Sequence, residues 1–262
     1  MTIKKVLHIA GNMDLGGSET LLININRNID GEKLRFDYAV ETSENGFYAR
    51  DIKALNGGVY PFILRRAPFA AYWFNIFNLI SVIKRHGPYE ALHVHYTYGN
   101  WFFLAVARLC GIKKRITHVH TTKLLDCGCF SLRNTLRRRL ILFFATDLFA
   151  CSYQAGIDLY GKNAKFTVIN NSIDCARFAY NPAVRAQVRQ AMGLNNKFVI
   201  CNISRLEIYK NHTFLLDVFA EVYKKNKNAV LMLAGGGSIE EELKAKALNL
   251  DLKDAVLFLG PR

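Results

Sequence analysis

The sequence has no Cys-x-x-Cys motif, and this absence argues against two classes of small domain, those held together by disulfides and those held together by structural zinc. Its six cysteines are scattered, and no Cys-x-x-Cys pair occurs among them. Cys127 and Cys129 are the closest pair, and no second pair follows them to complete a zinc site. Neither a disulfide framework nor a structural zinc domain is indicated, so we expect reduced thiols in a cytoplasmic protein.

Long hydrophobic runs are also lacking, because no stretch reaches the roughly 18 uninterrupted apolar residues of a membrane-spanning helix. The nearest candidate is the segment 67–83, in which Asn75, Asn78 and Ser81 recur every three residues. This spacing places a polar stripe along one side of a helix. We therefore predict an amphipathic helix there, which either packs on a sheet or lies at a membrane surface.

Acidic residues are scarce, since 21 Asp and Glu stand against 35 Lys and Arg, a net charge of +14. Residues 1–180 hold 23 basic and 13 acidic residues, and residues 181–262 hold 12 and 8. The segment 113–139 has eight basic residues and one acid, Asp126. Such a patch suits the phosphates of lipids, nucleotides or nucleic acid, or it is a solvated basic face. We expect no nucleic-acid partner, because the aromatic and basic strands of common RNA modules are lacking.

Short apolar runs alternate with longer helical patterns along the chain, which is typical of βαβ units around a parallel sheet. The runs are apolar almost throughout, as expected where helices cover both faces of a sheet. In the first part of the chain the predicted strands lie at 6–10, 36–40, 59–64, 91–96, 115–119, 148–152 and 166–170. The predicted helices there lie at 20–27, 69–83, 101–109 and 132–144.

A polar stretch that includes Pro182 interrupts this pattern, and we set a domain boundary near residue 180. A second series then follows, with strands at 198–203, 229–234 and 256–259 and helices at 212–223 and 240–248. The predicted fold class is α/β, with two Rossmann-like doubly wound parallel-sheet domains at 1–180 and 181–262. A complete domain of this kind has about six strands. We therefore expect 181–262 to be the first half of a truncated domain, whose first strand has an unpaired edge unless another element covers it.

The loop after the first predicted strand lacks both of the common phosphate-binding fingerprints. It runs from Gly11 to Glu19 and contains neither Gly-x-Gly-x-x-Gly nor Gly-Lys-Ser/Thr. Gly16 and Gly17 still allow the backbone to approach a ligand at a helix N-terminus, where N–H groups favour an anion. The alternative is a flexible turn in which Ser18 caps the helix and Glu19 complements its dipole.

Two His-x-His pairs stand at the ends of consecutive predicted strands, His93 with His95 and His118 with His120. Because side chains alternate along a strand, each pair lies on one face of the sheet. Imidazoles suit zinc, but no carboxylate cluster lies nearby in the sequence, and helices pack over the faces of such a sheet. We therefore expect no metal and predict that His93, His95 and His118 are core residues. His120 is the candidate to face a ligand crevice.

Two cations follow the first strand of the second series. Arg205 and Lys210 lie in the loop at its carboxyl end, just before a helix. Together they can neutralise a diphosphate, Arg205 through paired hydrogen bonds and Lys210 as a point charge. If the diphosphate is a leaving group, they stabilise its developing charge. A second loop, which holds Gly235, Gly236 and Gly237, follows the next strand and also suits close approach to a phosphate, although either loop can be an ordinary solvated turn.

Five ordered segments carry a resemblance to one family. They are Gly-Gly-Ser-Glu19, Ile-Thr-His-Val-His-Thr121, Val-Ile-Asn-Asn-Ser-Ile-Asp174, Ser-Arg-Leu-x3-Lys210 and Leu-Ala-Gly-Gly-Gly-Ser238. Through them essentially the whole chain resembles the retaining glycosyltransferases of family 4, which have the GT-B fold. The nearest subset is formed by bacterial exopolysaccharide and capsule glycosyltransferases.

The resemblance implies a role for each matching position. Gly16 and Gly17 are similar to the loop that approaches the donor diphosphate and the acceptor across an interdomain cleft. His120 is similar to the histidine that contacts the transferred sugar near its anomeric carbon. Arg205 and Lys210 are similar to the pair that holds the donor diphosphate. The loop 235–237 looks like the glycine loop beside the nucleotide.

The resemblance also implies that the family's Glu-x7-Glu element and the strands that grip the ribose follow Arg262. No matching segment occurs within the sequence, where residues 240–242 are three glutamates that begin a predicted helix. We therefore expect the C-terminal domain to be incomplete in this sequence. Neither a catalytic metal nor a cofactor is expected besides the nucleotide-sugar co-substrate.

Taken together, these features predict a cytoplasmic glycosyltransferase that moves a hexose-type unit from a nucleotide sugar to a saccharide or lipid-linked acceptor in polysaccharide synthesis. The basic first domain and the aromatic helix 69–83 would hold it peripherally on the anionic inner face of the cell membrane. The alternative hypothesis is a non-catalytic remnant that serves as an acceptor- or membrane-binding module. The sequence specifies neither the donor nucleotide, the sugar, the acceptor and the linkage nor the oligomeric state.

Overall fold

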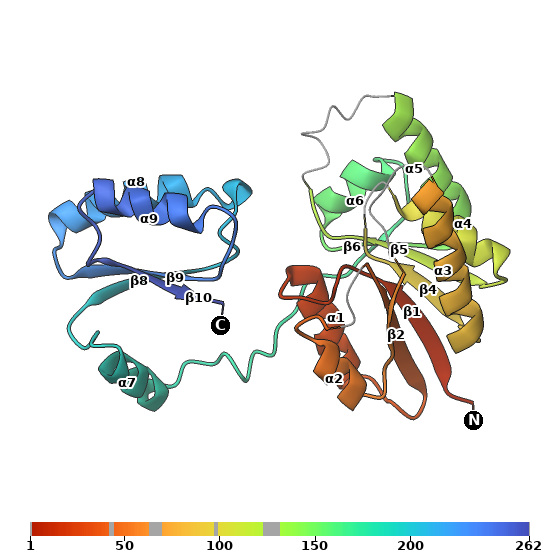
Figure 1. Ribbon diagram of the computed structural model, residues 1–262, viewed down its shortest axis with the longest axis horizontal. Coiled ribbons are helices and arrows are strands. Elements are labelled where there is room, and N and C mark those ends of the chain that lie inside the picture. The colour runs from red at the N-terminus through yellow and green to blue at the C-terminus, as the bar shows by residue number, and fades with distance from the viewer. Residues whose placement is uncertain (1, 42–44, 63–69, 97–98, 123–131, 262) are drawn as a thin grey trace. The chain divides into compact units, whose positions relative to one another are not determined.

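The computed structural model of the chain describes residues 2–41, 45–62, 70–96, 99–122 and 132–261 (Figure 1). The chain divides into two compact units, Met1–Cys175 and Ala176–Arg262, here called the first and the second unit. The division falls a few residues before residue 180, where the sequence analysis sets the domain boundary. Among the described residues, none of the helices combines the length and the apolar character that a bilayer crossing requires.

The first unit is built on a seven-stranded parallel sheet with the order β3-β2-β1-β4-β5-β6-β7. The chain runs outward from β1 to β3 and then returns to the other side of β1, so the strand order reverses between β1 and β4. The strands are β1 (Lys4–Ile9), β2 (Leu34–Val40), β3 (Val59–Pro61), β4 (Ala91–Val94), β5 (Lys114–Val119), β6 (Asp147–Ala150) and β7 (Thr167–Val168).

Helices cover both faces of this sheet (Figure 1). One face packs its apolar side chains against the first two helices, and the other face packs against the remaining four. The helices are α1 (Gly17–Asn28), α2 (Ala49–Ala54), α3 (Ala70–His86), α4 (Asn100–Leu109), α5 (Leu132–Phe144) and α6 (Tyr153–Tyr160). The central strands are therefore buried on both sides, which explains their nearly continuous apolar sequences.

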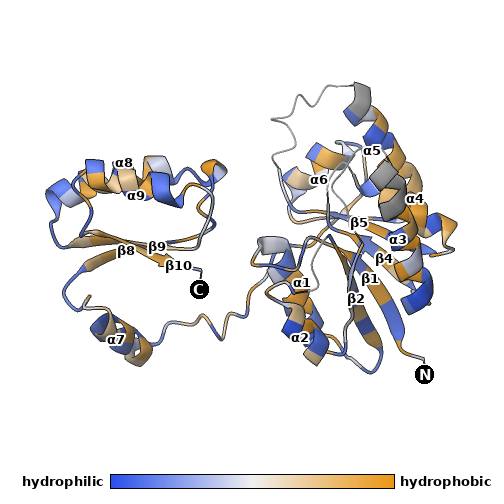
Figure 2. Ribbon diagram, in the orientation of Figure 1, coloured by the Kyte–Doolittle hydropathy of each residue, from blue (hydrophilic) through white to orange (hydrophobic). Residues whose placement is uncertain are grey.

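The second unit holds a three-stranded parallel sheet with the order β10-β9-β8. Its strands are β8 (Phe198–Ile203), β9 (Ala229–Ala234) and β10 (Val256–Gly260). They are largely apolar, whereas α8 (His212–Lys225) and α9 (Glu240–Asn249) alternate between apolar and polar residues (Figure 2). Apolar side chains of α8 and α9 pack on β9 and β10 to form the core. Within the described residues β8 pairs only with β9, so its other edge is unpaired as the sequence predicts.

The predicted α/β class, with two Rossmann-like parallel sheets, is confirmed, but three helices were not predicted. Ser152 was assigned to the end of a strand, yet β6 ends at Ala150 and the Ser152 hydroxyl caps α6 by accepting from the Ala155 N–H at 3.2 Å. The polar stretch at Pro182 is the start of α7 (Pro182–Ala191), which Asn181 caps. Both helices begin with a polar cap, and in the sequence alone such a residue is indistinguishable from the end of a strand or a break. The short helix α2 was missed as well.

Some sequence predictions fall outside the described residues. These are Cys127 and Cys129, the middle of the basic segment 113–139, the end of the predicted strand 59–64 and the start of the predicted helix 69–83. The strand predicted at 166–170 is shorter in the structure, where β7 has two residues.

A buried carboxylate joins three segments of the first unit. Asp37 on β2 is fully buried, and its oxygens accept hydrogen bonds from the Gly58 N–H at 2.8 Å and the Tyr89 hydroxyl at 3.0 Å. The Arg35 guanidinium lies 3.8 Å away. Burial, with the charge of Asp37 beside it, raises the pKa of Tyr89 above its usual range. The turn before β3 and the turn before β4 are thus both tied to β2.

We predict that Asp37→Ala lowers the free energy of unfolding of the first unit by about 3 kcal/mol, because two buried donors lose their acceptor. The matched control is Asp51→Ala, which removes an exposed ion pair with Arg27 and costs less than about 1 kcal/mol. Urea unfolding followed by tryptophan fluorescence reports this unit, since both tryptophans, Trp73 and Trp101, belong to it. Equal losses in the two variants would contradict the prediction.

Candidate functional site

In each unit the candidate residues lie at the edge of the sheet where the parallel strands end. The first-unit candidates are Gly16, the N-cap residue after β1, Gly17, the first residue of α1, and His120, which directly follows β5. The second-unit candidates are Arg205 and Lys210 after β8 and the glycines 235–237 after β9. Ligands of open α/β sheets bind at this edge, beside the point where the strand order reverses.

The β1–α1 loop is held in place by the segment that precedes α2. Met13 is fully buried in a left-handed conformation with φ 54°, and its carbonyl accepts from the Tyr48 N–H at 3.0 Å. Gly46 lies against the backbone of Asn12 so closely that a Cβ there would overlap the Asn12 carbonyl oxygen. These contacts hold the first half of the loop against the segment that precedes α2.

Gly16 and Gly17 leave the N-terminus of α1 open. Gly16 is the N-cap residue, and no side chain caps the helix there. A Cβ added to Gly17 would meet nothing within 4 Å, whereas one added to Gly16 would meet only the Glu19 carboxylate. Ser18 does not cap the helix as the alternative reading expected, since its hydroxyl donates to Glu19 Oε2 at 2.7 Å. The helix N-terminus can receive an anion, although Glu19 already places one negative charge beside it.

Five of the seven histidines form one cluster on the face of the first sheet that α1 covers. The register pairs His8 of β1 with His93 of β4, and His95, His118 and His120 extend the same face. The ring centroids of His93 and His95 lie 4.1 Å apart, as do those of His118 and His120. The sequence predicts the two pairs but gives no sign of His8, which joins them from a neighbouring strand.

Two hydrogen bonds run through the histidine cluster. Nδ1 of His8 lies 3.0 Å from Nε2 of His95, and Nδ1 of His95 lies 3.0 Å from Nε2 of His120. Nε2 of His8 and Nδ1 of His120, at the two ends, are buried with no hydrogen-bond partner among the described residues. His95 is thus not only a core residue, because it links His8 to the candidate site residue His120.

Burial keeps the cluster uncharged. It lowers the pKa of His8 and of His118 to about 3 and the pKa of His120 to about 4. The pKa values of His93 and His95 are held well below the ordinary range by burial and by the neighbouring histidines. At neutral pH His120 can therefore exchange hydrogen bonds with a sugar hydroxyl but cannot neutralise a phosphate.

The cluster contains two overlapping triads whose ring nitrogens lie close enough to hold a metal ion. One triad is His8, His93 and His95, the other is His95, His118 and His120, and the nitrogens within each lie within 4.8 Å of one another. Neutral imidazoles suit zinc or copper. Both nitrogens of His95 are engaged in hydrogen bonds, however, so a metal would have to replace one of them.

Tyr96 and Glu41 form a further polar contact at this edge that the sequence analysis did not single out. The Tyr96 hydroxyl donates to Glu41 Oε1 at 2.7 Å and lies 3.0 Å from the Ala10 carbonyl oxygen. Burial and the hydrogen bond with Glu41 raise the pKa of Tyr96 above its usual range. The contact joins the ends of β1, β2 and β4 beside the reversal in strand order.

In the second unit Arg205 and Lys210 are both exposed in the turn that follows β8. None of the ion pairs between described residues involves either of them. The Lys210 ammonium lies 5.6 Å from the Tyr209 ring centroid, and the charge of Arg205 helps to lower the pKa of Glu207. A buried histidine stabilises the turn. Nε2 of His212 lies 3.0 Å from the Ser204 hydroxyl and 3.2 Å from Asn202 Oδ1, and Ser204 donates to Asn202 at 2.8 Å.

The glycine loop is locked to the same turn. Glu207 accepts hydrogen bonds from the Ser238 hydroxyl at 2.7 Å and from its N–H at 3.3 Å, and these bonds lower the pKa of Glu207. A Cβ on Gly235 would overlap the Ser204 carbonyl, and one on Gly237 would overlap the Leu206 backbone. Two of the three glycines are thus required by contact with the protein's own backbone, and only Gly236 has ordinary space beside it.

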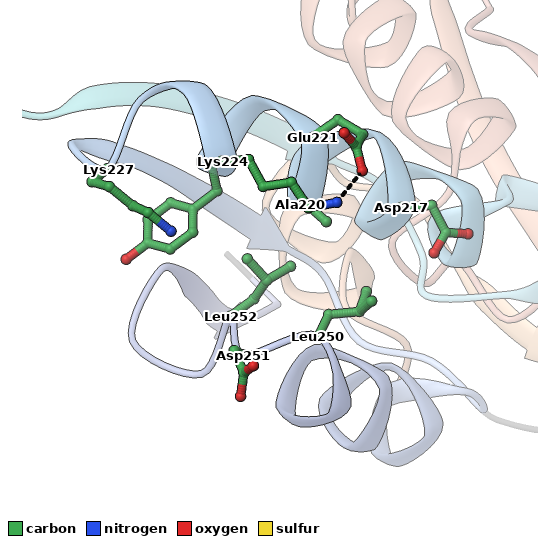
Figure 3. A pocket seen from close by; sticks show the side chains of 9 residues that line it. Asp217, Ala220, Glu221, Lys224, Lys227, Leu250, Asp251 and Leu252 are labelled. Carbon is green, nitrogen blue, oxygen red and sulfur yellow. Dashed lines mark hydrogen bonds and ion pairs between the residues drawn. The ribbon is translucent and has the colours of Figure 1, made fainter.

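A cavity of about 300 Å³ lies at the opposite edge of the second sheet. Figure 3 shows its lining, which comes from α8 and from the turn that ends in Leu252. Lys224 pairs there with Glu221, and the Lys227 ammonium lies 4.5 Å from the Tyr223 ring centroid. The amino ends of β9 and β10 are at this edge, so the cavity does not include Arg205 or Lys210.

We predict that lowering the pH from 7.5 to 5.5 destabilises the first unit. Unfolded histidine has a pKa near 6.5, whereas the folded cluster stays neutral down to about pH 4. The unfolded state therefore binds more protons below pH 6.5, and stability that is fully present above pH 6.5 is lost as the pH falls. Each clustered histidine contributes about 1.4 kcal/mol per pH unit.

Urea unfolding followed by tryptophan fluorescence at the two pH values measures this loss. His118→Gln is expected to make the pH dependence smaller by one histidine. His212→Asn, in the second unit, is the control and leaves it unchanged. A free energy of unfolding that is the same at pH 7.5 and 5.5 would refute a neutral buried cluster.

Comparison with known proteins places these features in one family. The family model described as "Glycosyltransferase Family 4" matches residues 15–177, and the one described as "Glycosyl transferases group 1" matches residues 184–262. The putative glycosyltransferase EpsF of Bacillus subtilis is 32% identical over 268 residues, which cover 98% of this chain and 68% of EpsF. The chain thus spans about two thirds of the length of that relative.

Two further proteins extend the comparison. A GDP-mannose-dependent phosphatidylinositol monomannoside mannosyltransferase of Mycobacterium tuberculosis is 27% identical over 158 residues, 59% of this chain and 40% of that protein. The structure of Anabaena HepE in complex with UDP and glucose superposes with a TM-score of 0.77 over 99% of this chain and 70% of HepE, at 20% identity. The likeness to HepE shows a shared GT-B fold. With both family models matched in order along the chain, this protein belongs to the family 4 glycosyltransferases, enzymes that transfer sugars from nucleotide-sugar donors.

Proposed function

We propose that this chain transfers a hexose-type unit, with retention of configuration, from a nucleotide sugar to a saccharide or lipid-linked acceptor of a cell-surface polysaccharide. The observation that carries the proposal is the pair of exposed, unpaired cations, Arg205 and Lys210, in a turn at the carboxyl end of β8. Similarity to EpsF supports an assignment to exopolysaccharide-type glycosyltransferases.

The second unit holds the donor diphosphate in this proposal. Arg205 offers paired N–H groups to the phosphate oxygens, and Lys210 adds a second positive charge. The contacts of His212 with Ser204 and of Glu207 with Ser238 fix the turn before the ligand arrives. When the bond between the sugar and the diphosphate breaks, the two cations stabilise the charge on the departing oxygen. They supply in this way the charge that a divalent metal would otherwise supply, so we propose a reaction that needs no metal.

The first unit contacts the sugars. His120, neutral at the end of β5, exchanges a hydrogen bond with a hydroxyl of the transferred sugar. Its Nε2 is taken by His95, so the contact falls to Nδ1, and because Nδ1 is buried in the free chain, the end of β5 must shift to expose it. Gly16 and Gly17 let the backbone at the start of α1 approach the substrates without a side chain between them. Both roles follow the family resemblance, and the open space beside Gly17 supports the second.

Binding of the donor tests this proposal. We predict that isothermal titration of the chain with UDP, GDP and their sugar conjugates gives binding to one nucleotide, since the relatives include proteins that take UDP and GDP-mannose. Arg205→Ala is expected to weaken binding by about 2 kcal/mol, or roughly 30-fold. The matched control is Arg185→Ala, an exposed arginine of α7, which leaves the affinity unchanged. Equal affinities of the two variants would refute the role of Arg205.

We further propose that the first unit docks on an anionic membrane, where lipid-linked acceptors lie. On α5, Leu136, Arg139, Leu142 and Phe143 are exposed at the three- and four-residue spacing of one helix face. The Arg108 guanidinium lies 5.3 Å from the Phe143 ring centroid. An apolar stripe with arginines beside it, on a chain of net charge +14, suits an anionic bilayer surface.

We predict that the chain sediments with phosphatidylglycerol vesicles at low salt and is released at high salt, because screening weakens the charge attraction. Phosphatidylcholine vesicles are expected to retain little protein. Phe143→Ser should reduce the bound fraction, whereas the control Phe214→Ser, an equally exposed phenylalanine of the second unit, should not. Absence of sedimentation at low salt would refute the membrane proposal but would not affect donor binding.

A further inference from the structure

The donor-site proposal uses only His120 of the five clustered histidines. Of the other four, His8 and His95 are hydrogen-bonded to His120 in a row, with His95 in the middle directly after β4. A row of this kind has a property that isolated core histidines lack. The position of one proton determines the positions of the others.

We propose that His8 and His95 are positioning residues, which fix the tautomer of His120 so that its Nδ1 carries the proton and donates to a sugar hydroxyl. The inference rests on the proposed contact between His120 and the transferred sugar. It adds that His8 on β1, acting through His95, determines whether Nδ1 of His120 is a donor or an acceptor in this contact.

Each neutral imidazole has one N–H donor and one acceptor nitrogen. Since the two hydrogen bonds use both nitrogens of His95, only two arrangements satisfy them. In the first, His8 Nδ1–H donates to His95 Nε2, and His95 Nδ1–H donates to His120 Nε2, so His120 carries its proton on Nδ1. In the second, every proton moves to the other nitrogen of its ring, and His120 Nδ1 becomes an acceptor.

The buried end of the row selects between these arrangements. His8 is 2% exposed, and its ring lies 4.3 Å from the Phe36 ring and 5.3 Å from the Tyr38 ring, measured between centroids. Its Nε2 has no hydrogen-bond partner among the described residues. An orphaned buried N–H is rarer in proteins than an under-used acceptor. Each arrangement leaves one N–H without a partner among the described residues, on His120 Nδ1 in the first and on His8 Nε2 in the second. The two ends differ, because His8 is enclosed by aromatic rings whereas His120 is half-buried at the end of β5, where a ligand hydroxyl can accept. The first arrangement, which places the N–H at the His120 end, is therefore the favoured one.

His93 and His118 provide an internal comparison. Their rings pack against His95 and His120 with centroid distances of 4.1 Å, yet neither takes part in the two hydrogen bonds of the row. Replacing His118 perturbs only the packing on this sheet face, whereas replacing His8 also removes the group that is hydrogen-bonded to His95. An effect seen with the His8 variant but not with the His118 variant is therefore due to the hydrogen bond.

The test is long-range proton–nitrogen NMR of the full chain labelled with nitrogen-15 histidine, at pH 7, with signals assigned from single substitutions. We expect His8, His95 and His120 each to be protonated at Nδ1 alone, against the preference of free imidazole side chains in water for Nε2. His8→Leu should return His95 and His120 to mixed tautomers. His8→Asn, nearly the same shape, keeps an N–H close to the Nδ1 position and should restore the Nδ1–H form. His118→Leu should leave both residues as they are.

Several results would overturn the proposal that His8 and His95 fix the tautomer of His120. One is a mixed or Nε2–H tautomer at any of the three residues in the unsubstituted chain, which needs no variant to fold. Another is a His120 tautomer that His8→Leu leaves unchanged. A third is stoichiometric binding of added zinc, with the nitrogen signals of one triad shifted together, which would make the cluster a metal site instead. None of these readouts requires donor binding, so they are independent of the titration with nucleotides.

Where turnover is measured, His8→Leu should lower kcat about tenfold with KM little changed, the equivalent of one hydrogen bond lost in the transition state. His8→Asn should recover most of this loss. A rise in KM alone, or a loss of the same size in His118→Leu, would contradict a positioning role.

Discussion

The parallel alignment of the strands is the constraint on which both units depend. Parallel pairing forces each connection to cross a face of the sheet, so the helices must lie on the faces and every strand must end at the same edge. The turns that hold Gly16, Arg205 and Gly235 are far apart in the sequence, yet each follows a strand of this kind. No residue of the candidate site could occupy its place if a single central strand ran the other way.

Rigidity at the carboxyl edge comes from contacts among the loops themselves. In the second unit Glu207 bonds to Ser238, and Gly235 and Gly237 lie against the backbone of the preceding turn. In the first unit Gly46 lies against Asn12 in a similar manner. Such contacts explain why glycines accumulate there without a ligand being invoked for each. They also hold the exposed cations on a fixed support, which reduces the entropy lost when a diphosphate is bound.

The sequence predicted the strands well because buried parallel strands are apolar almost throughout, and β8 and β9 begin and end where the apolar runs do. The prediction from sequence failed where a polar residue occurs both in loops and at helix N-termini. Ser152 and Asn181 resemble loop residues but are helix caps.

The His-x-His pairs follow from the alternation of side chains along one strand. Their contact with His8 requires β1 to lie beside β4 in the sheet. No local sequence pattern specifies that the strand order reverses between these two strands. The roles of the site residues come from the family resemblance and stay predictions, whereas the physical requirement for Gly237 follows from the Leu206 backbone beside it.

The open edge of β8 has a consequence for the behaviour of the polypeptide in concentrated solution. Ile203 at the end of this strand is 80% exposed, and within the described residues one whole side of β8 presents peptide groups without a neighbouring strand. A surface of that kind is complemented only by another extended backbone, and exposed edges of this sort are known sites of aggregation. Two factors therefore act in opposite directions on association through this strand: the unpaired peptide groups of β8 favour it, and the net charge of +14 opposes it.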